Sequence, residues 1–135
     1  MSKHKFGTTS TSRLITCDKQ LIWLFNEVLK YQDCTILCGY RDEAAQNKAL
    51  AEKKSTVKWP NSKHNTLPSK AVDVAPYPIP ENWTRPQFDY FAGCVMTVAQ
   101  QLGIKIRWGG DWNQNGVLVE PSQKFDDLVH FELVE

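Results

Sequence analysis

The sequence lacks the features that define several broad classes of protein. No apolar run approaches the roughly 20 residues that span a bilayer, so we expect no membrane insertion. The formal net charge is only +1 and the basic residues are spread along the chain, which gives no case for nucleic-acid binding. No repeat or low-complexity segment occurs. The 135 residues, 41% of them hydrophobic, predict one globular domain over residues 1–135.

Cysteine is also sparse. The four cysteines form no Cys-x-x-Cys pair, so they do not indicate a structural zinc site. No apolar stretch follows the basic N-terminal residues, so we expect no secretory signal and interpret the cysteines as free buried thiols. Cys34 and Cys38 have the same parity in an expected strand, which predicts that both face the core.

The spacing of apolar residues predicts an α+β protein. The helices expected from this spacing are residues 18–31, 42–53 and 84–102. The strands expected are residues 34–40, 71–75, 104–108 and 128–134. Asp18 is the expected N-cap of the first helix, Thr84 and Gln87 resemble a capping box, and Gly103 can end the last helix. Residues 1–17 are weakly patterned and are expected to form an N-terminal arm. Because the elements do not alternate as βαβ units, we expect a small, mostly antiparallel sheet flanked by about three helices.

Two distant segments contain the residue types that bind zinc. His64 lies in a polar, proline-containing loop over residues 54–69, Asp73 interrupts an apolar strand, and His130 lies in the last strand. An unpaired buried carboxylate is costly, and a cation at Asp73 would remove that cost. Two imidazoles and one carboxylate supply three zinc ligands and leave the fourth position for water. We therefore predict that His64, Asp73 and His130 bind Zn²⁺ in a cleft on the sheet. Ser62 could orient His64 or could simply cap the loop.

The last strand also offers a candidate general base. Asp127 stands three residues before His130, where its carboxylate could take a proton from water activated by the metal. Asp126 is the neighbouring alternative. Strand alternation places His130 and Glu132 on one polar face that could line a cleft.

Two other metal patterns are less complete. Residues 111–116 match the first half of a calcium loop, but Ser122 occupies the twelfth place, where a bidentate glutamate is expected. An Asx-rich turn is therefore the simpler interpretation. A non-haem iron triad also uses two histidines and one carboxylate, but its usual His-x-Asp start is absent.

The chain resembles the zinc D-Ala-D-Ala carboxypeptidase and L-alanyl-D-glutamate peptidase family, especially its bacteriophage endolysin branch. The family pattern is Ser-x-His, Ala-x-Asp and Asp-x-x-His, which is present here from Ser62, Ala71 and Asp127. The interval from the first histidine to the aspartate is nine positions here and seven usually, so residues 66–69 are expected to loop out. Further similarity lies in residues 5–7, in residues 39–41 with Gln46, and in residues 102–112.

The resemblance implies a zinc peptidase that cuts the L-alanyl-D-glutamate bond of bacterial peptidoglycan stem peptides during phage lysis. Such an enzyme waits in the host cytoplasm until the membrane is breached. The alternatives are a D-Ala-D-Ala carboxypeptidase or dipeptidase with the same metal site, and a non-catalytic wall-binding module. We expect a monomer.

The resemblance also implies roles for individual residues. It selects Asp127 as the base. The family has an arginine at the position of Arg41, which could bind a substrate carboxylate or stabilise an oxyanion. An ion pair with a neighbouring acidic residue is the alternative for Arg41. Gln46 is a weaker candidate of the same kind. Trp108, Trp112 and Tyr77 could form a wall of the groove, although large aromatic residues are more often core.

Overall fold

The computed structural model describes residues 4–116 and 127–134. The α-helices are α1 (Thr8–Leu14), α2 (Lys19–Val28), α3 (Glu43–Ala51) and α4 (Arg85–Leu102). The strands are β1 (Cys34–Cys38), β2 (Ala71–Pro76), β3 (Ile106–Gly109) and β4 (Asp127–Leu133). Two short 3₁₀ turns are η1 (Lys63–Asn65) and η2 (Glu81–Trp83). The predicted α+β class is confirmed.

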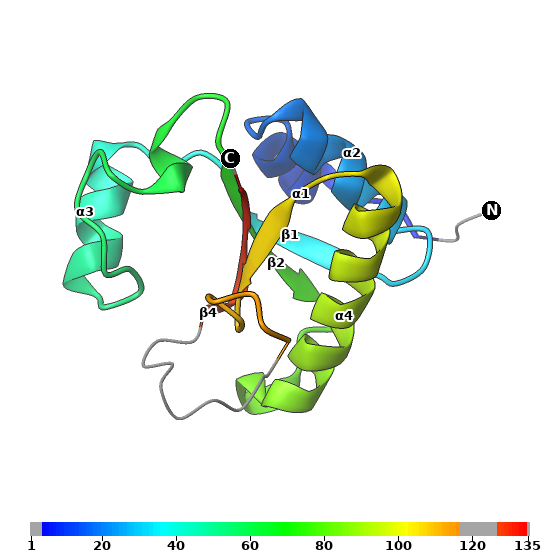
Figure 1. The fold of residues 1–135 in the computed structure, drawn as a ribbon. Helices are drawn as coiled ribbons and strands as arrows, with labels where there is room; N and C mark the ends of the chain where they lie inside the picture. Colours follow the sequence, from blue (N-terminus) through cyan, green and yellow to red (C-terminus); the bar gives the residue numbers. More distant parts are fainter. Residues whose placement is uncertain (1–3, 117–126, 135) are drawn as a thin grey trace.

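The four strands form one antiparallel sheet in the order β1-β2-β4-β3. Helices α1, α2 and α4 lie on one side of this sheet, and α3 with the loop that follows it lies on the other (Figure 1). Alternation along each strand therefore sends one set of side chains into the helical layer and the other set toward α3. This division separates the core from the functional face.

The core fills the space between the sheet and its three covering helices. Phe131 of β4 lies at its centre, with edge-to-face contacts to Phe25 of α2 and Phe91 of α4 at ring-centroid distances of 5.5 and 6.2 Å. All three rings are almost fully buried, and burial of each contributes roughly 1.5–3 kcal/mol. The packing fixes β4, and therefore also fixes the residues of β4 that point away from the core.

The sequence signals for helix ends have mixed outcomes. Asp18 caps α2 by accepting a hydrogen bond from the backbone N–H of Gln20, and Gly103 ends α4 with a φ of 73°. Both were predicted. Thr84 precedes α4 but makes no side-chain capping bond, so the predicted capping box with Gln87 is wrong. Pro86 fixes the first turn of α4 instead.

The prediction that residues 1–17 form an arm is wrong for residues 8–14, which form α1 and bring the helices to four. The short helix buries Leu14 and Ser10, and the Ser10 hydroxyl accepts a hydrogen bond from the backbone N–H of Ile36 in β1. Arg13 donates to the Ile36 carbonyl. One apolar and one small polar residue face the protein, a pattern too sparse to be detected as an amphipathic helix.

The prediction for Cys38 is also wrong. The register of β1 against β2 shifts between Ile36 and Cys38, which breaks the strict alternation on which the prediction relied. Cys34 is buried, whereas Cys38 is half-buried and pairs in register with Asp73. All four cysteines are free, as predicted, but the predicted burial holds only for Cys17 and Cys34, because Cys94 is half-buried like Cys38. Among the helices described, none combines the length and apolarity needed to cross a bilayer.

Candidate metal centre

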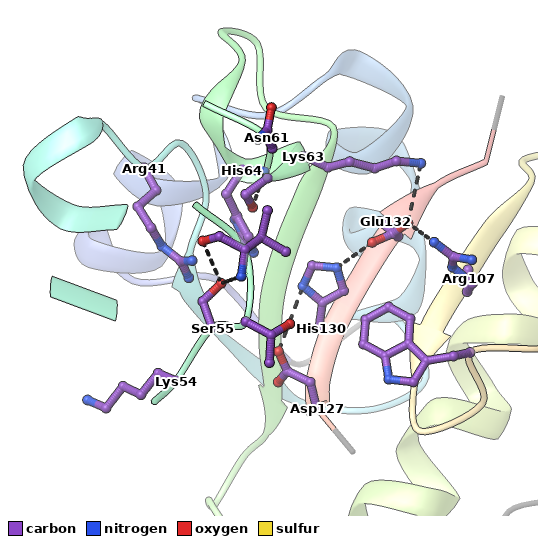
Figure 2. Close-up of a pocket in the computed structure, with 14 residues that line it drawn as sticks. Arg41, Lys54, Ser55, Asn61, Lys63, His64, Arg107, Asp127, His130 and Glu132 are labelled. Carbon is purple, nitrogen blue, oxygen red and sulfur yellow. Dashed lines mark hydrogen bonds and ion pairs between the residues drawn. The ribbon is translucent and has the colours of Figure 1, made fainter. Parts of the chain in front are cut away.

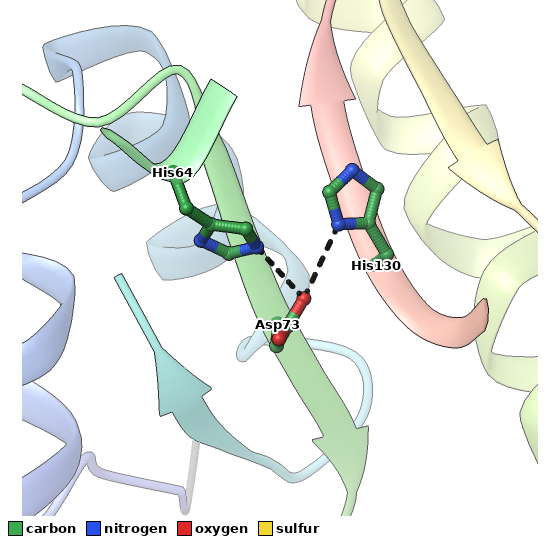
Figure 3. Close-up of side chains that lie close together, drawn as sticks. All are labelled: His64, Asp73 and His130. Carbon is green, nitrogen blue, oxygen red and sulfur yellow. Dashed lines mark hydrogen bonds and ion pairs between the residues drawn. The ribbon is translucent and has the colours of Figure 1, made fainter. Parts of the chain in front are cut away.

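His64, Asp73 and His130 converge on one point, with both imidazoles directed at the Asp73 carboxylate (Figure 3). Oδ1 of Asp73 lies 3.2 Å from Nε2 of His64 and 3.4 Å from Nδ1 of His130. One ligand atom from each of the three side chains lies within 4.8 Å of the other two. The group could therefore hold one metal ion.

Strand pairing places two of these residues side by side. Asp73 of β2 and His130 of β4 are direct partners in the antiparallel ladder. Residues paired in this way have side chains on the same face, with Cβ atoms about 4.5–5.5 Å apart. Their neighbours Val72 and Phe131 point into the core on the opposite face. Sequence position alone did not reveal this register.

The loop before β2 delivers His64. Ser62 accepts a hydrogen bond from the backbone N–H of His64 and caps η1, while Asn65 Oδ1 accepts from the Ser62 N–H. The backbone N–H of Lys70 donates to the Lys63 carbonyl at 3.0 Å, so the two ends of the intervening segment meet. Residues 66–68 are exposed, as expected of an outward loop, but the prediction is wrong for Ser69, which is buried and donates its hydroxyl to the Ala71 carbonyl. These hydrogen bonds of Ser62 are those of a loop cap, not of an imidazole partner.

Gly39 orients the His64 ring. Its carbonyl lies 2.7 Å from Nδ1 of His64, and because a carbonyl can only accept, Nδ1 carries the proton and Nε2 faces Asp73. A Cβ on Gly39 would lie 2.3 Å from the Arg13 carbonyl oxygen, so only glycine allows this close approach.

Glu132 orients the second imidazole. Its Oε1 lies 2.8 Å from Nε2 of His130, and its Oε2 lies 2.7 Å from Arg107 and 3.3 Å from Lys63 (Figure 2). Nδ1 of His130 is thus left facing Asp73. Hydrogen bonds from a ligand histidine to a carboxylate or to a carbonyl are typical of metal sites.

Electrostatics reinforce this arrangement. Burial alone would lower the pKa of His64, but the Asp73 carboxylate outweighs it and raises that pKa to about 10. Burial opposes ionisation of Asp73, yet the two imidazoles hold the pKa of Asp73 well below its usual range. The pKa of Glu132 is lowered to about 2, because His130 and Arg107 outweigh the effect of burial. The Asp73 carboxylate is therefore ionised and buried, and it requires positive charge beside it.

Asp127 lies next to this group without joining it. Its Oδ2 is 4.0 Å from Nδ1 of His130, and its side chain is 24% exposed. Burial, followed by the negative charge of Asp73, raises the pKa of Asp127 to about 6. A carboxylate in this position can exchange a proton with a molecule bound in the cleft.

Arg41 contacts Asp73 of this group and Gln46 of α3. One guanidinium nitrogen lies 3.4 Å from Oδ2 of Asp73, and the other donates to Oε1 of Gln46 at 3.0 Å. Gln46 is fully buried and also donates to the Val57 carbonyl and to Ser55. Gln46 therefore acts on Arg41 and on the loop after α3, and it is too deeply buried to touch a substrate directly.

The group opens into a cleft of about 440 Å³ between the loop after α3 and the β3–β4 edge of the sheet (Figure 2). The lining includes Arg41, His64, Trp112, Asp127 and His130. Trp112 was predicted to wall this groove and does so, with its ring 5.4 Å from that of His130.

Trp108 is not part of this lining. It is 3% exposed, lies in the core and donates through Nε1 to the Leu128 carbonyl, so the prediction that it walls the groove is wrong and the alternative of a core position is confirmed. Tyr77 is exposed and also lies outside this lining, so the same prediction is wrong for Tyr77. Trp108 shares its strand face with Ile106, and that face packs against the helices. Arg107, between them, faces the cleft.

No role was predicted from the sequence for Arg107 or Lys63, and Glu132 was placed in the cleft without its partners. The parity of β4 already placed Glu132 on the face of His130. Arg107 and Glu132 are direct partners across β3 and β4, a relationship that depends on a register the sequence does not state.

The turn after β3 has the geometry expected of an Asx-rich loop. The two carboxylate oxygens of Asp111 accept hydrogen bonds from the backbone N–H groups of Asn115 and Gly116. Ser122 and Asp126, which entered the predictions for a calcium loop and for the base, lie outside the described residues.

Comparisons with known proteins give matches over most of the chain. The family model described as phage L-alanyl-D-glutamate peptidase matches residues 1–134. The L-alanyl-D-glutamate peptidase of Escherichia phage T5 is 33% identical over 117 residues, which cover 83% of this chain and 84% of that protein. The crystal structure of the Serratia marcescens L-Ala D-Glu endopeptidase ChiX has a TM-score of 0.74 at 24% identity and covers 98% of this chain and 91% of its own. That last similarity concerns the fold.

Proposed function

Because the chain belongs to the phage L-alanyl-D-glutamate peptidase family, we propose that it is a zinc-dependent peptidase that hydrolyses the L-alanyl-D-glutamate bond of peptidoglycan stem peptides. The observation that carries the proposal is the convergence of His64, Asp73 and His130 in a cleft that also holds Asp127. A phage endolysin with these properties acts on the cell wall after the membrane of its host is breached. We propose that it works as a monomer.

The donor set suits zinc. His64 would bind through Nε2, His130 through Nδ1 and Asp73 through a carboxylate oxygen, and the second nitrogen of each imidazole already has a hydrogen-bond partner. The need of the Asp73 carboxylate for a cation supports the same conclusion. Zinc supplies Lewis acidity, which lowers the pKa of water to about 7 and polarises a carbonyl group.

Asp127 and Arg41 perform the protein's part of the reaction. Asp127 accepts a proton from the water whose oxygen attacks the L-alanyl carbonyl carbon. As the C–N bond breaks, Asp127 returns that proton to the departing D-glutamyl nitrogen. Arg41, held by Gln46, stabilises the negative charge that develops on the carbonyl oxygen.

Digestion of purified sacculi, followed by mass analysis of the products, tests this function. We expect release of peptides that begin with D-glutamate, and no release in the presence of a zinc chelator. Loss of only a terminal D-alanine would show the alternative carboxypeptidase activity. Binding to sacculi without any product would show a non-catalytic wall-binding module. Elemental analysis of protein purified without added metal would distinguish zinc from iron.

A further inference from the structure

The cleft has a cationic end that the catalytic steps do not use. Lys63 and Arg107 both approach Oε2 of Glu132, at 3.3 and 2.7 Å. Glu132 carries one negative charge, and the two neighbours together carry two positive charges. One positive charge is therefore left without an opposite charge within this cluster, although the Lys63 ammonium group also donates to the Leu133 carbonyl. A metal ion at the neighbouring centre would add further positive charge.

Arg107 is held in place but keeps donors for a ligand. A guanidinium has five N–H donors, and among the described residues Arg107 makes one side-chain hydrogen bond, to Glu132. Its Nε is buried, so the donors that remain for a ligand are those of the two terminal nitrogens. Its Cζ lies 5.4 Å from the centroid of the Trp112 ring, which supports the flat face of the guanidinium. The side chain is 34% exposed and lines the cleft. These are the properties of a receptor for a planar anion.

Arg41 is less suited than Arg107 to bind such an anion. Its two terminal nitrogens lie against Gln46 and Asp73, and its side chain is only 13% exposed. Arg41 therefore acts at the metal centre itself. Arg107 is further away, because it contacts Glu132, which in turn contacts the candidate ligand His130.

We infer that Arg107, assisted by Lys63, binds the free carboxylate of the glutamyl residue next to the scissile bond. This inference rests on the proposed function. A glutamyl residue within a peptide uses one carboxyl group for the chain and keeps the other free, only a few bonds from the scissile nitrogen. A substrate with its D-glutamyl side toward β3 and β4 would place that carboxylate near the guanidinium. The specificity for an acidic residue thus arises from the Arg107 end of the cleft.

Two synthetic peptides test the inference. Both contain the L-Ala–D-Glu bond, and they differ only in whether the free carboxyl group is an acid or a carboxamide. Binding is measured by calorimetry to the zinc-loaded Asp127→Asn protein, in which turnover is blocked. We expect the acid to bind roughly 10- to 100-fold more tightly than the amide, as a charge-assisted bidentate contact predicts.

Arg107→Met, in the same Asp127→Asn protein, should bring the two affinities within about twofold by weakening only the acid. Arg107→Lys should keep part of the preference, and Arg85→Met, on α4 outside the cleft, should keep all of it. Equal binding of the two peptides before substitution would overturn the inference. Equal weakening of both by Arg107→Met would also overturn it, because Arg107 would then act only by holding Glu132.

Cleavage by the unsubstituted enzyme separates this inference from the proposed function. Preferential binding of the acid without cleavage of either peptide would remove the function and leave the carboxylate site. Cleavage of both peptides with equal kcat/KM would leave the function and remove the carboxylate site.

Discussion

Nε2 of His130 lies 2.8 Å from Oε1 of Glu132, two residues further along the same strand. The carboxylate is 6% exposed, and its other oxygen is bound by Arg107 and Lys63. Three segments of the chain therefore cooperate to fix one imidazole. A histidine whose outer nitrogen is held in this way keeps its inner nitrogen directed at a metal.

The first prediction concerns Glu132 itself. Glu132→Gln keeps the shape of the side chain but removes the charge that Arg107, Lys63 and His130 share. We expect zinc affinity to fall roughly 10- to 100-fold, as is typical when a partner of a ligand histidine is lost. Competition with a chromophoric chelator measures the affinity. Glu27→Gln, in the surface pair with Lys30 on α2, is the matched control, and equal affinities of the two variants would contradict the prediction.

The second prediction separates proton transfer from metal binding. Asp127→Asn should lower kcat by roughly 10²- to 10⁴-fold, the usual contribution of a general base, while the protein still binds one zinc. Asp127 lies 4.0 Å from the ligand nitrogen of His130, close enough to exchange protons in the cleft but outside the His64, Asp73 and His130 group. Product analysis and elemental analysis of the same sample measure both properties. Loss of zinc together with activity would show that Asp127 is a ligand.

The third prediction concerns the effect of the metal on stability. A ligand that binds only the folded state at 100 times its Kd stabilises it by about 2.7 kcal/mol. Zinc should therefore raise the Tm of the wild-type protein and leave the Tm of His130→Ala unchanged. Calcium or magnesium at the same concentration provides the control, since imidazole ligands favour zinc. A Tm that does not respond to zinc would contradict the assignment of the site.

The candidate residues were predictable from residue type, but their geometry was not. Asp73 was conspicuous because a carboxylate interrupts an apolar strand, and His64 and His130 stood in recognisable motifs. Their meeting depends on the pairing of β2 with β4, since Asp73 and His130 are partners only in that register. Register arises from packing over the whole sheet, which a local pattern does not contain.

The predictions that were wrong also failed because packing between distant segments decides which side chains face the core. Trp108 and Arg107 are neighbours, and the sequence alone does not say which of them faces the cleft. The structure shows that Trp108 packs in the core and that Arg107 pairs with Glu132. In α1, Ser10 occupies a buried position where an amphipathic helix usually has an apolar residue. Its hydroxyl accepts a hydrogen bond from a backbone N–H group of β1, which makes the polar side chain favourable there. Each of these outcomes was decided by a contact between distant segments.

The fourth prediction concerns Gln46, which connects α3 to the site. Its amide group accepts hydrogen bonds from Arg41 and Asn65 and donates to the Val57 carbonyl, all in a buried position. Gln46→Ala removes these hydrogen bonds from a buried position, and we expect a loss of about 1–3 kcal/mol in the free energy of unfolding, measured with urea. Catalysis should also weaken, because Arg41 loses its support. Gln101→Ala, at an exposed position of α4, should change neither property.

The last prediction is a pH dependence of stability that is independent of the site. Asp18 accepts a hydrogen bond from the Gln20 N–H and lies 2.8 Å from the Lys70 ammonium group. The Lys70 contact, followed by the Gln20 hydrogen bond, lowers the pKa of Asp18 in the folded state. A carboxylate whose pKa is lowered by folding stabilises the protein above its unfolded pKa of about 3.9, and this contribution disappears as the pH falls through the folded value.

Asp18→Ala should therefore cost about 1 kcal/mol near neutral pH, the usual value of an N-cap, and progressively less below about pH 4. Urea unfolding of both proteins from pH 7 to pH 2.5 measures the difference. Glu43→Ala, at an exposed position of α3, serves as the control for loss of a surface carboxylate. A cost for Asp18→Ala that stays constant across this range would mean that the ionised carboxylate contributes nothing beyond the shape of the cap, because the groups common to both proteins titrate alike and cancel in the difference.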